Sequence, residues 1–355
     1  MLNRLRAWWR GKARAQTAPA APPEPGRARG AVDHIIILDG TLSTLTPGQE
    51  GNCGLLYKLL IEDGQKTHRT VYYEQGLQWQ GWKQVMAIVE GRGLNRQIRR
   101  AYGWLASHYR EGDRIFLFGY SRGAYAVRSL AGVIDRVGLL RREHATERGV
   151  QLAYRHYQNG PDTVAAAAFA RRFCHAKPRI EMIGVWDTVK SLGLPLFGFG
   201  TLRKHAFHSH HLGNSIRHGF QALAIHETRS VFEPVLWDSP ETGATHVQQM
   251  WFRGAHGDIG GMIGDDAAAR PLANIPLVWM LDQAQGLGLD LPENWHARFP
   301  CDPAAPMVGT LRGWGALFLL RRKRRMLRDR SEAVHPSAQQ ARASFGWISA
   351  LTKRG

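Results

Sequence analysis

The stretch "RIFLFGYSRGAYAVRSLAG", residues 114–132, decides the fold. Apolar residues at 115–118 run directly into a Gly-x-Ser-x-Gly spacing in which Gly119 and Gly123 flank Ser121. A short apolar run that ends at glycine predicts a buried strand, and the small and apolar residues that follow have the spacing of a helix. The stretch therefore predicts a strand, a tight turn that carries the serine, and a helix that begins at the turn.

Strands and helices alternate along the rest of the chain. Short β-branched and apolar runs predict strands, and segments with apolar residues three or four positions apart predict helices. This alternation is typical of an α/β fold with a mostly parallel central sheet and helices on both faces. The expected strands are 34–41, 70–76, 114–119, 179–189 and 247–261, the last ending in a glycine-rich loop, and the expected helices are 94–109, 122–138 and 272–288.

The chain divides into three parts. Residues 1–32 are a basic arm followed by a Pro/Ala-rich linker, a composition that does not form a regular helix. Residues 33–300 are the α/β domain, and helical insertions are expected at about 141–178 and 190–245, where the alternation breaks. Residues 301–355 are a basic C-terminal extension.

Composition limits the class of protein. The chain has 355 residues, of which 44% are hydrophobic, enough to bury a large core. No apolar run approaches the roughly 20 residues of a membrane-spanning helix, and the N-terminus lacks the apolar centre of a secretory signal. The three cysteines are far apart, which favours a reducing compartment. The expected location is the cytoplasm, with peripheral attachment to a membrane as an option.

Positive charge is concentrated in two clusters. The formal net charge is +18, and basic residues crowd residues 1–16 and 313–330. Such clusters attract polyanions, although they also occur as solvated arms and helices. Trp8 and Trp9 lie among the first set, and an apolar stretch precedes the second, which favours an anionic membrane surface. No zinc-finger, RNA-binding or helix-turn-helix pattern is present, so nucleic acid is not an expected partner.

A serine on a strand-to-helix turn is typical of the nucleophile in α/β-hydrolase-like folds. The alternative is an ordinary loop serine between two glycines. A nucleophilic serine needs a base and an orienting acid, which follow it in the order acid, then histidine. Asp187 closes one predicted strand and His256 lies in the loop after another, so these two are the candidates. His226 and His335 are competing bases, and an aspartate in this position is also common as a turn or cap residue.

The oxyanion hole requires two backbone N–H donors. One is expected from Arg122, directly after the serine, and the other from Gly40 or Thr41 in the loop after the first strand. Asp39 is expected to orient that loop, or else to pair with Asp258 in binding a cation.

No metal or cofactor is otherwise expected. The histidine-rich segment "HAFHSHH", residues 205–211, matches no regular spacing of metal ligands.

Several motifs in one order resemble a known family. They resemble the bacterial α/β-hydrolase-domain family of largely uncharacterised proteins that includes phospholipase effectors of the type VI secretion system. The resemblance covers about residues 33–290 and also "VHPS" at 334–337, and it implies Ser121 as nucleophile, Asp187 as acid and His256 as base. The motifs are "ILDGT", "GRGLNRQIRRAYGWL", "GDRIFLFGYSRGAYAVRSLAGVI", "IGVWDTVKSLG", "FQALAIHETRSVFEPVLW" and "QQMWFRGAHGDIGG".

The sequence departs from the family pattern at three places. Ser43 stands where an asparagine is usual, His226 stands where an acidic residue is common, and the large extra membrane-binding region of the bigger effectors is missing. The expected function is a serine hydrolase that cleaves carboxylic esters through a Ser-Asp-His triad, as a lipase or phospholipase at an anionic membrane. The alternatives are a soluble esterase or thioesterase, or a non-catalytic membrane-associated protein.

Overall fold

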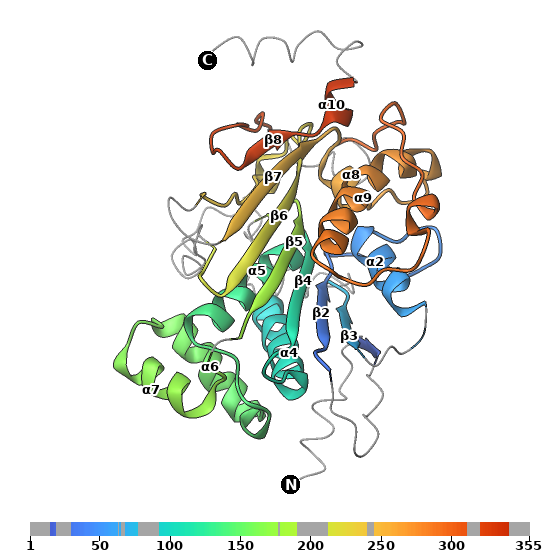
Figure 1. The fold of residues 1–355 in the computed structure, drawn as a ribbon. Coiled ribbons are helices and arrows are strands. Elements are labelled where there is room, and N and C mark those ends of the chain that lie inside the picture. The colour runs from blue at the N-terminus through green and yellow to red at the C-terminus, as the bar shows by residue number, and fades with distance from the viewer. Residues whose placement is uncertain are drawn as a thin grey trace.

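A central sheet of eight strands organises the molecule (Figure 1). The computed structural model describes residues 15–18, 30–62, 64, 68–76, 92–176, 178–189, 212–239, 245–310 and 320–340. The strand order is β1-β3-β2-β4-β5-β6-β7-β8, and every neighbouring pair is parallel except β1 with β3. The strands are β1 (Ala15–Ala18), β2 (Asp33–Leu38), β3 (Arg69–Glu74), β4 (Arg114–Tyr120), β5 (Ile180–Trp186), β6 (Ile216–Ala224), β7 (His246–Phe252) and β8 (Glu332–Val334).

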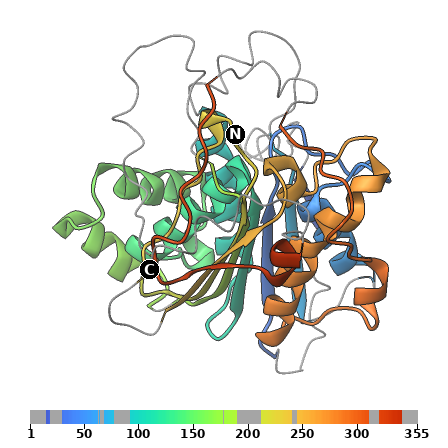
Figure 2. The same cartoon turned by 90° about the horizontal axis from the view of Figure 1, so that it is seen from above.

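Helices cover both faces of the sheet (Figures 1 and 2). One hydrophobic cluster joins one face to α4, α5 and α6, and a second joins the other face to α2 and α9. Strand β2 serves both, because Ile36 and Leu38 belong to the first cluster and Ile35 and Ile37 to the second, as the two-residue period of a strand requires. The helices are α2 (Asn52–Ile61), α4 (Arg92–His108), α5 (Arg122–Arg136), α6 (Glu147–Asn159), α7 (Val164–Phe173), α8 (His256–Gly260), α9 (Arg270–Gly286) and α10 (Pro336–Gln340).

The predicted fold class is confirmed, and each expected strand and helix is present. Most differ by a few residues at their ends, but the strand expected at 247–261 ends at Phe252, and part of its glycine-rich loop forms helix α8. The helix after Ser121 ends as expected, since Gly138 has φ +103° and its N–H bonds back to Val133 and Ile134. The insertion at 141–178 is helical and contains α6 and α7.

The prediction of a helical insertion at 190–245 is wrong for the part that forms a strand of the central sheet. Residues 216–224, inside the expected insertion 190–245, form β6 between β5 and β7. The strand was hidden because Arg217, His218 and Gln221 interrupt its apolar pattern. The two flanking parts also contribute strands, since β1 comes from the N-terminal arm and β8 from the C-terminal extension.

Parallel pairing brings distant polar residues to one edge of the sheet. Ser121 follows β4, Asp187 follows β5 and His256 lies just after β7. Because the carboxyl ends of parallel strands share an edge, these three side chains are brought to one place. None of the described helices has the length and apolar character needed to cross a membrane.

Candidate active site

Ser121 occupies a strained turn between β4 and α5. Its backbone has φ +56° and ψ −119°, a conformation that non-glycine residues rarely adopt. The flanking glycines permit the turn: a Cβ at Gly123 would lie 2.0 Å from the Leu38 carbonyl oxygen, and one at Gly119 would lie 2.7 Å from the Gly123 oxygen. Backbone is therefore packed against backbone at this turn, and the Ser121 side chain lies at the carboxyl-terminal edge of the sheet.

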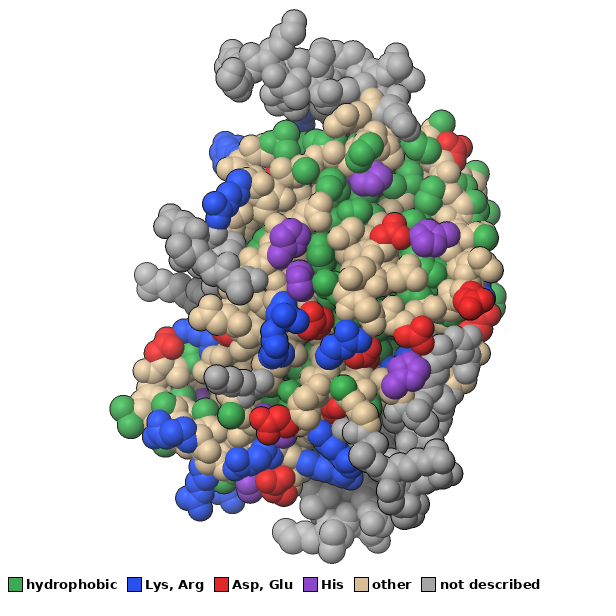
Figure 3. Space-filling view, viewed as in Figure 1, with side chains coloured by type: hydrophobic (Ala, Val, Ile, Leu, Met, Phe, Trp, Pro, Cys, Tyr) green, Lys and Arg blue, Asp and Glu red, His purple; other side chains and the backbone are tan. Residues whose placement is uncertain are grey.

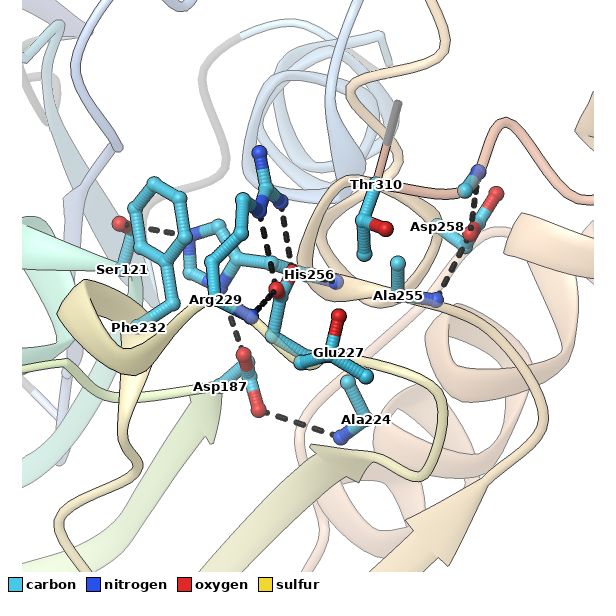
Figure 4. Close-up of polar contacts among 12 residues, drawn as sticks. Ser121, Asp187, Ala224, Glu227, Arg229, Phe232, Ala255, His256, Asp258 and Thr310 are labelled. Carbon is cyan, nitrogen blue, oxygen red and sulfur yellow. Dashed lines mark hydrogen bonds and ion pairs between the residues drawn. The ribbon is translucent and has the colours of Figure 1, made fainter. Parts of the chain in front are cut away.

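A chain of hydrogen bonds joins the three predicted residues (Figure 4). The Nε2 atom of His256 lies 2.8 Å from the Oγ of Ser121, and its Nδ1 lies 2.6 Å from Oδ2 of Asp187. All three residues are buried. With Nδ1 protonated and donating to the carboxylate, Nε2 is left to accept the serine proton.

The competing histidines are engaged elsewhere. The Nδ1 of His226 accepts the Gly254 N–H at 3.1 Å, and the Nδ1 of His335 lies 2.8 Å from the hydroxyl of Ser337. Among the described contacts of Ser121, the histidine partner is His256.

Aromatic rings fix the plane of the His256 imidazole. Phe232 stacks on it with ring centroids 4.7 Å apart and an interplanar angle of 14°, and Tyr120 lies at 4.8 Å and 31°. The Tyr120 hydroxyl also donates to the His256 carbonyl oxygen at 3.1 Å. These contacts limit rotation of the ring, so Nε2 stays directed at Ser121.

Asp187 is held by more than the histidine. Its backbone φ is +43°, and Oδ1 accepts the Ala224 N–H at 3.1 Å. Arg324 places Nη1 2.5 Å from Oδ1 and Nη2 2.8 Å from Oδ2. Burial opposes ionisation of Asp187, but the charge of Arg324 and the hydrogen bonds from His256 and Arg324 outweigh it and hold its pKa well below the usual value. The carboxylate is therefore ionised at neutral pH.

Glu227 supports the histidine from its backbone side. The fully buried carboxylate accepts the His256 N–H at 3.2 Å and the Arg229 N–H at 2.7 Å. The Arg229 guanidinium pairs with it at 2.6 Å, and the Cζ atom of Arg229 lies 4.3 Å from the centroid of the Phe232 ring. Burial raises the pKa of Glu227, but the bonds and charge of Arg229 outweigh burial and lower it. Glu227 thus links the segment 227–232 to the start of α8.

The loop after β2 approaches the serine closely. A Cβ at Gly40 would lie 2.5 Å from the Tyr120 ring and 3.5 Å from Cβ of Ser121. The Gly40 N–H, however, donates to Asp39 Oδ1 at 2.7 Å. Of the two expected donors in this loop, the Gly40 amide is therefore already engaged, and Thr41 is the better candidate. Arg122 is the first residue of α5, where backbone N–H groups lack helical partners.

The two further acidic residues hold separate loops. Asp39 accepts the Tyr73 hydroxyl at 2.8 Å in addition to the Gly40 N–H, and burial raises its pKa to about 6. Asp258 accepts the N–H groups of Ala255 at 2.8 Å and Val308 at 2.7 Å. These bonds favour a loop-orienting role for Asp39 over a cation site shared with Asp258.

Three residues at the site were not found from the sequence. Arg324 lies in a run of arginines that favours a membrane-binding cluster, and its contact with Asp187 spans 137 positions. Glu227 directly follows His226, which stands where an acidic residue is common in the family, and no motif marks Glu227 itself. Phe232 carried no recognisable signal. Residues 1–14, 205–211 and 311–319 lie outside the described part of the chain.

Comparisons with known proteins agree with the expected resemblance. The family model for the catalytic domain of Tle1-like phospholipase effectors of the type VI secretion system matches residues 33–283. The uncharacterized protein YEL023C of Saccharomyces cerevisiae is 28% identical over 225 residues, which cover 56% of this chain and 32% of the yeast protein.

Two solved structures are also similar to the chain. An uncharacterized protein from Pseudomonas aeruginosa has a TM-score of 0.42 at 15% identity, covering 77% of this chain and 49% of the other. The Tle1 effector bound to the VgrG spike of the type VI secretion system has a TM-score of 0.32 at 18% identity, covering 66% of this chain and 52% of the other. The chain spans about a third to a half of the length of these relatives. Because the family model matches most of the chain, the protein belongs to the family of Tle1-like phospholipase effector catalytic domains.

Proposed function

We propose that the protein is a serine hydrolase that cleaves carboxylic ester bonds of phospholipids or related lipids. The observation that carries the proposal is the buried hydrogen-bonded chain from Ser121 through His256 to Asp187, on a strand-to-helix turn. This arrangement has the order and geometry of a nucleophile, a base and an orienting acid. Membership of a family named for phospholipase effectors supports a lipid substrate.

The first half of the reaction forms an acyl-enzyme. His256 Nε2 accepts the Ser121 proton as Oγ attacks the ester carbonyl, and the carbonyl oxygen gains the negative charge of a tetrahedral intermediate. The N–H groups of Arg122 and Thr41 stabilise that oxyanion. The intermediate collapses when the protonated imidazole returns its proton to the leaving alkoxide, and the alcohol departs.

The second half releases the acid. Water replaces the alcohol, His256 accepts one of its protons, and the hydroxide attacks the acyl carbon. Collapse of the second intermediate breaks the bond to Ser121 Oγ, which regains a proton from His256. Asp187 stays ionised throughout, and its charge stabilises the imidazolium that forms in both halves.

Binding to an anionic membrane surface is part of the proposal. The described segment 320–330 exposes Leu320 and Leu327, at 67% and 48%, among several exposed arginines. Figure 3, in the orientation of Figure 1, shows basic side chains at the upper left, where the segment before β8 lies. Exposed apolar side chains among basic ones favour the interface of an anionic bilayer.

The test is lipid-product mass spectrometry. Purified wild type and Ser121→Ala are incubated with vesicles of phosphatidylglycerol and phosphatidylethanolamine. Free fatty acid and lysophospholipid should appear with wild type alone. Hydrolysis of a short-chain soluble ester without any lipid product would favour a soluble esterase, and equal activity of both proteins would remove Ser121 from the mechanism.

A further inference from the structure

The C-terminal segment 320–330 is built into the wall of the site. The Ser230 N–H donates to the Leu320 carbonyl at 3.0 Å, and the Arg322 N–H donates to the Thr228 carbonyl at 2.6 Å. This pairing fastens the segment to residues 227–232, which carry Glu227 and Phe232. The segment therefore lies against the same elements that hold the imidazole of His256.

One arginine of the segment points inward. The Arg324 side chain is 4% exposed, whereas the side chains of Arg322 and Arg325 are exposed. Its two terminal nitrogens contact both carboxylate oxygens of Asp187, at 2.5 and 2.8 Å. Nη1 also donates to the Ala224 carbonyl at 3.1 Å, and Nη2 donates to the Phe232 carbonyl. A guanidinium bonded at four points has a fixed plane and fixes the plane of the carboxylate.

We propose that Arg324 is a positioning residue of the active site, which acts through Asp187 on the orientation of His256. The inference rests on the proposed function, because it assigns a role within that reaction. It makes the basic C-terminal segment a part of the catalytic apparatus as well as a surface for lipid.

The geometric effect follows from the sharing of Oδ2. This oxygen accepts from both His256 Nδ1 and Arg324 Nη2, while Oδ1 accepts from Arg324 Nη1 and the Ala224 N–H. Removal of the fork leaves the carboxylate held only by the Ala224 N–H and His256 Nδ1, so it rotates more easily about its bond to Cβ. The His256 ring then loses its directed partner, and small displacements of a base in a proton transfer are costly.

The electrostatic effect has a defined sign. The positive charge of Arg324 lies against the Asp187 carboxylate and favours its ionised form, which is the form that orients His256. Loss of the charge raises the pH needed to keep Asp187 ionised, so the acid limb of the pH–rate profile moves to higher pH.

Three variants test this role on a soluble short-chain ester, which avoids any contribution from lipid binding. Arg324→Gln removes the charge, Arg324→Lys keeps it without the fork, and Arg155→Ala, at an exposed arginine of α6, is the control. Arg324→Gln should lower kcat about 10²-fold with little change in KM, and should move the acid limb upward by about one pH unit. Arg324→Lys should keep the wild-type acid limb and recover part of kcat, and Arg155→Ala should match wild type.

Thermal melting of each variant separates a positioning role from loss of folding. An Arg324→Gln protein that melts as wild type does, with unchanged kcat and acid limb, would overturn the inference; so would a lower kcat with no movement of the limb. If Arg324→Gln does not fold, Arg324→Lys becomes the test. Wild-type kcat in Arg324→Lys would show that the two-pronged contact with Asp187 is not needed to position His256, and would overturn that part of the inference. Ser121→Ala is measured in parallel to distinguish failure of this inference from failure of the proposed function. Residual turnover by Ser121→Ala would count against the proposed function and not against the role of Arg324.

Discussion

At the scale of single residues, the site depends on strained positions held by many weak contacts. Ser121 and Asp187 both have positive φ, and each sits where a parallel strand ends. Such conformations cost about 1–3 kcal/mol each and persist when the surroundings determine them. For Asp187 the surroundings are Arg324, His256 and the Ala224 N–H, which donate hydrogen bonds to its fully buried carboxylate.

Asp187→Asn tests the need for a charged acid at unchanged size. The neutral amide cannot stabilise the imidazolium by charge, and its NH2 group donates to Nδ1, which favours the tautomer of His256 protonated on Nε2. We expect kcat to fall about 10⁴-fold, measured on a soluble ester. Glu293→Gln, an exposed acid, serves as the matched control and should match wild type. Loss of less than tenfold with Asp187→Asn would show that another group orients the base.

The raised pKa of Asp39 predicts that the free energy of unfolding depends on pH. Burial raises its pKa in the fold to about 6, from an ordinary value of 3.8. Between these values the folded state holds a proton that the unfolded state has lost, so this residue makes stability fall as pH rises from about 4 to about 6. The size is roughly 3 kcal/mol. Denaturant unfolding of wild type and Asp39→Asn across this range should show a difference that changes in this direction; a constant difference would contradict the raised pKa.

At the scale of elements, the strand β4, the turn and α5 form a unit whose local sequence specifies it. The strand, the flanking glycines and the helix were all predictable because the interactions that select them lie within a few residues. Asp187 and His256 were predictable as positions at strand ends, given parallel pairing. Strand β6 was not, because its polar residues are satisfied by tertiary contacts, such as Gln221 bonding Thr188 and the Val235 carbonyl.

Gly123→Ala tests whether the turn is closed by backbone contact. The new Cβ would lie 2.0 Å from the Leu38 carbonyl oxygen, and the packed strand β2 cannot move far enough to relieve this clash. We expect a loss of about 1–3 kcal/mol in the free energy of unfolding, together with loss of esterase activity. Gly286→Ala is the matched control, because a Cβ at the end of α9 meets nothing within 4 Å. Wild-type stability of the Gly123 variant would mean that the turn relaxes freely.

At the scale of the whole molecule, the C-terminal extension contributes both exposed basic residues and Arg324, which contacts the candidate active site. The sequence indicated a basic surface there, but an inward arginine and its exposed neighbours look alike in a linear run. Arg324 contacts Asp187 across 137 positions, and neither local spacing nor composition contains that information. The same holds for Glu227, which meets the His256 backbone across 29 positions. Long-range polar contacts of this kind can be identified only when the three-dimensional structure is known.

The exposed arginines of the extension should control lipid binding without changing the chemistry. Replacing Arg322, Arg325 and Arg328 with alanine should weaken binding to phosphatidylglycerol vesicles by about 1 kcal/mol per residue, read by co-sedimentation. Turnover of a soluble ester should stay at the wild-type level, since all three side chains are exposed. Vesicle binding that is unchanged, and insensitive to added salt, would remove this segment from the membrane surface.

The most direct test of the central claim is the site of covalent modification by a fluorophosphonate probe, read by peptide mass spectrometry. Wild type should carry one adduct on Ser121, with labelling abolished in Ser121→Ala and slowed strongly in His256→Ala. An esterase-active wild-type protein that carries no adduct on Ser121, or equal labelling of wild type and Ser121→Ala, would contradict the assignment of this serine as the nucleophile.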